Sequence, residues 1–443
     1  MKGAVAFFCV MAATACCFAA VKRPWISGVT DRNPLEYRCS ETMTFTLKLE
    51  NVDSPPDGAV VEWTRTGDDG KVDTGKVPAR SGAEFQVKTS LDRPGFVRIA
   101  AVVRKADGSV WMPDGKPAKK ERSGGYPGSV FFDGGAGADV AAIRQSVSEP
   151  ADFDAFWARH KAKLAEVPMD GATCSELPGR NPKVKIFMVS VPCAGPKPAT
   201  GYLIVPAAEG RFPAEISFYG YGTSWSKTAT AAPDGTRETG RVLKLLLSAH
   251  GFELNRDAAY YRAEKKRVKS NGYGHAFDPA QNADPEQAYF CGMTYRVMRG
   301  IEYLKSRREW NGCDLTVSGP SQGGLQSIWG AALSQGVTRA RIEVPWCCDM
   351  GGPSIGRNHG EWFVEWVPQL GYYDPVNMAR RIPKTCRVDI VRAGLGDYTC
   401  PPTGIAAFYN NLSGPKSIVW VQGSKHGYVP PDPQKISMKR SAP

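Results

Sequence analysis

The chain has 443 residues, of which 42% are hydrophobic, so it is long enough for two or three domains with a sizeable core. Its formal net charge is +12, but no nucleic-acid-binding motif accompanies the short basic runs. We therefore expect solvated basic surfaces and no nucleic-acid partner. Beyond the first 20 residues no stretch is apolar enough to cross a bilayer, so we expect no membrane span.

Residues 1–20 have the pattern of a cleaved signal peptide. Lys2 supplies a positive charge, Gly3 to Ala15 is almost wholly apolar, and small residues follow. A lipoprotein anchor at Cys16 or Cys17 is less favoured, because the residues just before them make a poor lipidation site. The sequence therefore predicts a secreted or periplasmic protein.

The cysteines are scattered. Three of the 12 lie in the predicted signal peptide, which leaves nine without the spacing of a zinc site. We expect most of them to be small buried residues, with one or two disulfides compatible with the pattern. The sequence predicts no metal and no cofactor.

Residues 21–133 are predicted to form an all-β domain. Hydrophobic and polar residues alternate over Glu41–Glu50, and turn signals separate further strand-like runs. This pattern favours an immunoglobulin-like sandwich. Trp63, Phe85 and Phe96 lie within the strand patterns, so we interpret them as core residues; a platform for sugar binding is the alternative.

A glycine-rich linker is predicted at 134–147, and an α/β domain at 148–430. The α/β domain opens with a helix over Asp152–Leu164 and continues with alternating strands and helices, which predicts a mostly parallel sheet with helices on both faces. The expected strands are 184–191, 202–205, 214–218, 251–254, 340–344 and 388–392, with helices near 242–246 and over 285–307. Residues 431–443 are predicted to be a mobile tail.

Residues 349–383 interrupt the α/β pattern with an aromatic-rich insertion. We interpret it as a pocket wall or a contact in a homo-oligomer, and packing within a lid is the alternative.

The stretch 314–329 carries the chemistry. A strand-like run ends at Ser318, Gly319-Pro-Ser-Gln-Gly323 follows, and a helical run begins near Leu325. This is a G-x-S-x-G motif between a strand and a helix, which predicts that Ser321 is a nucleophile on a strained turn.

The general base must be a histidine that follows the serine in the chain. Of five histidines, only His359 and His426 qualify. His426 comes just after an apolar strand, Ile418–Val421, whereas His359 leaves little room for an acid-bearing strand. We therefore predict that His426 is the base.

The acid should lie between the serine and the base. Asp397 follows the predicted strand 388–392, so it can orient the imidazole. Asp349 and Asp374 compete in chain order, but they follow no comparable strand end.

At these residues the chain resembles the acetyl xylan esterase and cephalosporin-C deacetylase family, carbohydrate esterase family 7. The resemblance rests on four segments and on their order: Gly319–Gly324, Gly396–Pro402, Tyr409–Lys416 and Lys425–Gly427. It covers about residues 148–430 and implies an α/β-hydrolase fold with Ser321, Asp397 and His426 as nucleophile, acid and base.

The segment Phe218–Gly222 resembles the oxyanion segment of that family. We expect the backbone N–H groups of Tyr221 and Gln322 to form an oxyanion hole, and Tyr219 and Trp225 to contact substrate. Tyr219 stands where the family usually has histidine, which changes the expected shape of the pocket.

These features predict a secreted serine esterase that removes acetyl groups from xylan or xylo-oligosaccharides through an acetyl-serine intermediate. A broad carboxylesterase or peptidase of the same fold is one alternative. An inactive glycan-binding protein is another.

Overall fold

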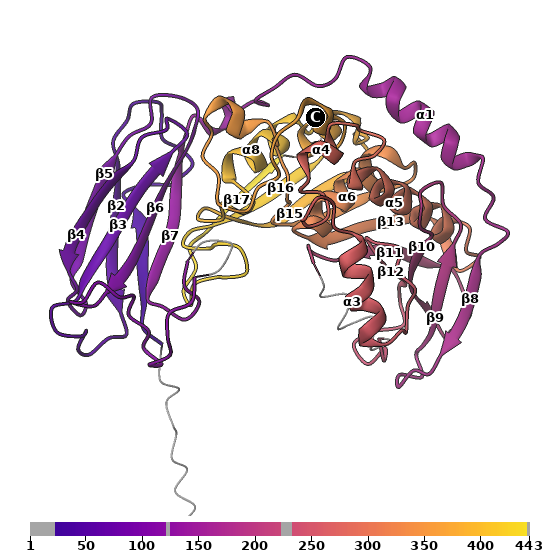
Figure 1. The fold of residues 1–443 in the computed structure, drawn as a ribbon, viewed down its shortest axis with the longest axis horizontal. Helices are drawn as coiled ribbons and strands as arrows, with labels where there is room; N and C mark the ends of the chain where they lie inside the picture. Colours follow the sequence, from indigo (N-terminus) through magenta and orange to yellow (C-terminus); the bar gives the residue numbers. More distant parts are fainter. Residues whose placement is uncertain (1–22, 121–124, 223–232, 441–443) are drawn as a thin grey trace, which may run out of the picture.

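The computed structural model describes residues 23–120, 125–222 and 233–440. The predicted signal peptide and Trp225 therefore lie outside the described residues. Figure 1 shows an all-β domain at the N-terminus, in indigo and purple, beside a larger α/β domain in magenta to yellow. Within the described ranges no helix combines the length and apolar character that a membrane span requires.

The N-terminal domain consists of antiparallel sheets around one hydrophobic core. One sheet has the order β1-β2-β5, with β1 Trp25–Thr30, β2 Met43–Glu50 and β5 Glu84–Thr89. The other has the order β4-β3-β6-β7, with β4 Asp73–Pro78, β3 Val60–Gly67, β6 Gly95–Arg104 and β7 Phe131–Ala138. In β2, Met43, Phe45 and Leu47 are buried, because alternate residues of a strand face the same side. The all-β character agrees with the sequence; the immunoglobulin-like type stays a prediction.

The predicted linker at 134–147 is wrong at its start, because Gly134–Gly137 belongs to strand β7. Glycine is depleted in strands, and a run of it resembles a loop. Here the missing side chains permit close packing. A Cβ atom on Gly135 would lie 2.4 Å from the carbonyl oxygen of Val97 and 2.9 Å from that of Leu395 in the other domain.

The α/β domain is built on a ten-stranded sheet. The strand order is β17-β16-β15-β14-β13-β11-β12-β10-β9-β8. Strands β12, β11, β13, β14, β15 and β16 pair in parallel, and both ends of the sheet are antiparallel. The bounds are β8 Thr173–Leu177, β9 Val184–Val191, β10 Ala199–Pro206, β11 Phe212–Phe218, β12 Leu243–Leu247, β13 Trp310–Pro320, β14 Arg339–Glu343, β15 Arg387–Gly394, β16 Lys416–Val421 and β17 Lys435–Arg440.

Helices cover this sheet (Figure 1). The described helices are α1 Phe153–Ala165, α3 Ala258–Arg267, α4 Pro279–Asn282, α5 Tyr289–Lys305, α6 Gln322–Leu333, α7 Pro375–Met378 and α8 Pro402–Asn411, with short 3-10 turns at Val140–Ala142, Gly352–Ile355, Pro368–Tyr372 and Ala379–Arg381. Helix α1 docks through its aromatic face: Trp157 Nε1 donates to the carbonyl of Tyr372 at 3.0 Å, and the rings of Phe156 and Tyr372 stack at 4.1 Å. Part of the aromatic insertion therefore packs against α1.

Three further predictions are wrong. Residues 243–247 form β12 rather than a helix, because Leu243, Leu245 and Leu247 are the buried residues and their spacing is that of a strand. Residues 251–254 are not a strand. The predicted tail contains β17, which pairs with β16 and packs Ile436 and Met438 against the core.

The two domains share a tight interface. Gln422 forms two hydrogen bonds of 2.9 Å with the backbone of Gly135, one as donor and one as acceptor. The rings of Phe96 and Trp420 lie 5.5 Å apart. The end of β16 and the residue that follows it therefore rest on the N-terminal sheet.

All nine cysteines in the described residues are free, and five of them are buried. The one or two disulfides that the sequence allowed are not formed among them.

Candidate active site

Ser321 lies on a sharp turn between β13 and α6. Its backbone has φ 54° and ψ −118°, a conformation that L-residues rarely adopt. The turn requires glycine on both sides: a Cβ atom on Gly319 would lie 2.6 Å from the carbonyl oxygen of Phe218, and one on Gly323 would lie 2.5 Å from the same atom. Strand, turn and helix thus have the geometry of a nucleophile elbow.

The turn is held by its neighbours. The N–H of Ser321 donates to the carbonyl of Glu343 at 2.9 Å, and the N–H of Trp346 donates to the carbonyl of Ser321 at 3.2 Å. Gln322 is the first residue of α6, and N–H groups in a first helical turn have no partner within the helix. Such an N–H group can donate to a developing oxyanion beside the serine.

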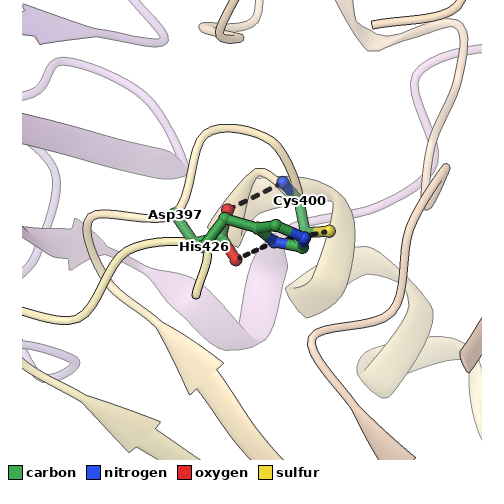
Figure 2. Close-up of side chains that lie close together, drawn as sticks. All are labelled: Asp397, Cys400 and His426. Carbon is green, nitrogen blue, oxygen red and sulfur yellow. Dashed lines mark hydrogen bonds and ion pairs between the residues drawn. The ribbon is translucent and has the colours of Figure 1, made fainter. Parts of the chain in front are cut away.

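Asp397 and His426 are joined by a hydrogen bond. His426 Nδ1 lies 3.0 Å from Asp397 Oδ2 (Figure 2). Asp397 is fully buried, and its other carboxylate oxygen accepts from the N–H groups of Thr399 and Cys400, both at 3.1 Å. These contacts fix the carboxylate, which in turn orients the imidazole so that Nε2 is left for proton transfer.

The alternative candidates for the base and the acid lie away from Ser321 and His426. His359 bonds to the carbonyl of Gly360 at 2.7 Å and lines a separate small pocket with Asp349, which pairs with Arg357. Asp374 accepts three backbone N–H groups, and burial together with Asp349 raises its pKa to about 7. The structure therefore brings neither alternative acid to His426.

Ser321 and His426 line one pocket of about 1030 Å³. Among the described residues no hydrogen bond joins Ser321 to His426, a separation common in free enzymes. Tyr221, Trp346 and Trp362 form an aromatic side of the pocket, with Tyr221 edge-on to both tryptophans at 5.4 and 5.1 Å.

Tyr219 does not lie on the aromatic side of this pocket. Its side chain packs with a separate apolar cluster that includes Tyr202 and Phe252, and burial raises its pKa. It is absent from the described residues that line the pocket. Tyr219 therefore packs, partly buried, against the apolar cluster beside β10 and not on the pocket wall, and its contact with substrate stays a prediction.

Sequence reasoning missed His275. The Nε2 atom of His275 lies 3.1 Å from Gln322 Nε2, and its ring stacks on Tyr221 with centroids 4.0 Å apart. Tyr221 also donates its hydroxyl proton to the carbonyl of His275 at 3.1 Å. Burial lowers the pKa of His275 to about 3, so the ring is neutral at pH 7 and can accept from the Gln322 amide. His275 therefore contacts both residues that were predicted to hold an oxyanion.

Asp397, Cys400 and His426 each offer a donor atom, and these atoms lie within 4.8 Å of one another. Burial raises the pKa of the Cys400 thiol well above its usual value, and a protonated thiol is a poor metal ligand. His426 Nδ1 and Asp397 are already bonded to each other. The cluster therefore suits proton transfer better than metal binding.

Comparison with known proteins identifies relatives over most of the chain. The family model for acetyl xylan esterase (AXE1) matches residues 138–351 and 358–439. The chain is 25% identical over 365 residues to the acetyl esterase Axe7A of Xylanibacter ruminicola, an alignment that covers 80% of this chain and 75% of that protein.

Solved structures share the fold. The acetyl xylan esterase from Paenibacillus sp. R4 aligns with a TM-score of 0.52 and 23% identity, covering 66% of this chain and 94% of that chain. Acetyl xylan esterase 1 from a Thermoanaerobacterium species aligns with a TM-score of 0.52 and 21% identity, covering 66% and 93%. The α/β domain thus has the α/β-hydrolase fold with a mostly parallel sheet.

Proposed function

The chain belongs to the acetyl xylan esterase family and is a carbohydrate esterase, and from this we propose that it removes acetyl groups from xylan or xylo-oligosaccharides with Ser321 as nucleophile. The family supports deacetylation of acetylated saccharides in general. The choice of xylan and the serine mechanism are the parts that we propose.

In the first half-reaction Ser321 Oγ attacks the acetyl carbonyl carbon, and its proton passes to Nε2 of His426. The backbone N–H groups of Tyr221 and Gln322 bind the oxyanion, and each such donor typically contributes about 3 kcal/mol. The C–O bond to the sugar then breaks, and the sugar oxygen takes the proton from His426. The products are a free hydroxyl and an acetyl-serine.

In the second half-reaction water attacks the acetyl-serine. His426 takes one proton from the water and returns it to Ser321 Oγ as acetate leaves. Asp397 stabilises the imidazolium that forms in each half-reaction.

One observation carries the proposal: His426 and Ser321 line the same pocket. His426 is hydrogen-bonded to Asp397 at 3.0 Å, and Ser321 lies on a turn with a positive φ angle. A serine without a catalytic role rarely adopts this strained backbone conformation. The arrangement supports nucleophilic catalysis more than passive glycan binding.

The test is acetate release from acetylated xylo-oligosaccharides. Ser321→Ala should lose about 10⁴-fold or more in turnover while its circular dichroism stays unchanged, because the three residues act as a unit. Ser327→Ala is a matched control, since Ser327 lies in the same helix and only bonds to the carbonyl of Gly323. Substantial acetate release by Ser321→Ala would refute the proposal.

A second pair of variants tests the base. His426→Ala should be nearly inactive, and His359→Ala should keep the wild-type rate. Activity that survives in the first and vanishes in the second, with both proteins folded, would assign the base to His359.

We also propose that the protein is exported, from the signal-like pattern of residues 1–20. Mass spectrometry of the mature protein should find an N-terminus close to residue 21. A mature chain that still begins at Met1 would refute export by this signal.

A further inference from the structure

The pocket that contains Ser321 is formed by both domains. One wall comes from the N-terminal domain, through the segment that follows β6 and precedes β7. The described residues of this wall are Met112, Asp114, Lys116, Pro117, Lys119, Lys120 and Pro127. The volume of about 1030 Å³ is at the upper end of the range for ligand pockets, so it can hold several sugar units.

The wall is basic. Its lining residues include Lys116, Lys119 and Lys120 against one acidic residue, Asp114, and Arg392 adds a further positive charge from the α/β domain. Arg392 is mostly buried and donates through Nε to Glu343 at 2.7 Å. The three lysines are therefore the exposed positive charges of the pocket.

Two of the lysines are held only by exposed ion pairs. Lys116 Nζ lies 3.3 Å from Asp114, with the lysine side chain 78% exposed. Lys120 Nζ lies 2.6 Å from Glu361, with the side chains 53% and 60% exposed. Ion pairs this exposed are weak, so an anion on a bound ligand can replace the carboxylate partner. Lys119 has no acidic partner in the part of the chain that the structure describes.

The wall is attached at both domains. The N–H of Trp111 donates to the carbonyl of Val103 at 2.9 Å, which fixes the start of the segment to β6. At the far side Lys120 pairs with Glu361, the neighbour of the pocket residue Trp362. Lys120 is thus held beside the aromatic side of the pocket, where the acetyl group would bind.

We propose that this basic wall binds the carboxylate of a uronic acid unit, so that the enzyme prefers acetylated saccharides that carry uronic acids over neutral ones. This inference rests on the proposed function, because the wall surrounds the same pocket. Lysine ammonium groups act as point charges and need no fixed geometry of the carboxylate, which suits a substituent whose position along a sugar chain varies. It also gives the N-terminal domain a role in choosing the substrate.

The experiment compares two oligosaccharides of equal length and acetyl content, one bearing glucuronic acid and one neutral. Acetate release should give a higher kcat/KM for the acidic one at low salt, and the preference should shrink as sodium chloride is raised, since salt screens exposed charges. The triple variant Lys116→Ala, Lys119→Ala, Lys120→Ala should reduce the preference about fivefold or more and leave the neutral substrate nearly unchanged.

Lys88→Ala is the control, because Lys88 is exposed on β5 and lines none of the described pockets around Ser321. Equal kcat/KM for both oligosaccharides in the wild type would overturn this inference alone. A triple variant that loses the same fraction of activity on both substrates would also overturn it, since the wall would then contribute through its shape and not through its charge. No acetate from either oligosaccharide would overturn the proposed function and this inference with it.

Discussion

The imidazole of His275 lies parallel to the phenol ring of Tyr221, with centroids 4.0 Å apart and an interplanar angle of 12°. The same imidazole contacts the side chain of Gln322 at 3.1 Å. Tyr221 and Gln322 come from different segments, the loop after β11 and the start of α6. His275 is therefore a positioning residue that holds the two predicted oxyanion donors in register.

His275→Gln should lower kcat about tenfold to hundredfold and change KM little, because the donors matter most when charge develops on the carbonyl oxygen. Steady-state kinetics with an acetyl ester separate the two constants. His359→Gln is the control, since that residue lies in another pocket. A variant with wild-type kcat, or one in which only KM rises, would contradict the positioning role.

Stability should fall as the pH falls below about 6.5. Burial lowers the pKa of His275 from 6.5 to about 3 and lowers that of His250 well below 6.5. Between these values the unfolded chain binds protons that the native state does not, so the free energy of unfolding decreases with acidification. The contribution is at most about 1.4 kcal/mol per pH unit for each group.

Urea unfolding between pH 7 and pH 4 measures this effect. His275→Gln should show a shallower fall than the wild type, because it lacks one of the buried histidines whose pKa is lowered. Identical slopes for the two proteins would show that acid unfolding has another origin.

The acyl pocket should favour acetyl groups. Tyr221 packs against both Trp346 and Trp362, so a longer acyl chain must displace packed rings. Such displacement costs more than the roughly 0.8 kcal/mol that a buried methylene contributes. We expect kcat/KM to fall steeply from acetyl to butyryl esters of one alcohol.

Trp362→Ala should raise the ratio of butyryl to acetyl hydrolysis, because it removes one of these rings. Phe363→Ala is the neighbouring control, since Phe363 lines the other pocket. Wild-type enzyme that hydrolyses both esters equally well would favour a general carboxylesterase instead.

Gly396→Ala should weaken both the fold and the site. An added Cβ would lie 1.8 Å from the carbonyl oxygen of Asp133, so either the domain interface or the loop that carries Asp397 must move. We expect a loss of about 1–3 kcal/mol in the free energy of unfolding, with a lower kcat. Gly195→Ala is the control, because its Cβ would meet nothing closer than 3.5 Å. A Gly396→Ala protein as stable and active as wild type would contradict this reading of the interface.

The sequence was informative where the signal is local. Ser321, Asp397 and His426 each follow a strand end, and strand ends of a parallel sheet meet at one edge, so their order along the chain was enough to group them. The parallel centre of the sheet and helix α5 were predicted from the pattern of strands and helices along the chain, and the family from its resemblance at Gly319–Gly324 and three later segments.

Contacts between distant segments were not predictable. His275 meets Gln322 only through tertiary packing, and no periodic pattern marks it. The glycines of β7 have the composition of a linker. Their close packing against the backbone of the other domain is a tertiary contact, and the local sequence does not indicate it. The basic run that begins at Lys119 was predicted to be a solvated surface, because nothing in the local sequence places it beside Ser321.

The paired hydrogen bonds between Gln422 and Gly135 limit how far the chain can be truncated at its N-terminus. A fragment that began at residue 148 would leave Gln422 and Trp420 without the partners that β6 and β7 provide. The loop that carries Asp397 would also lose a packing contact, since Gly396 lies directly against the backbone of Asp133. The smallest expression unit for a working enzyme therefore includes the whole β-domain, and module shuffling between relatives has to move both halves together.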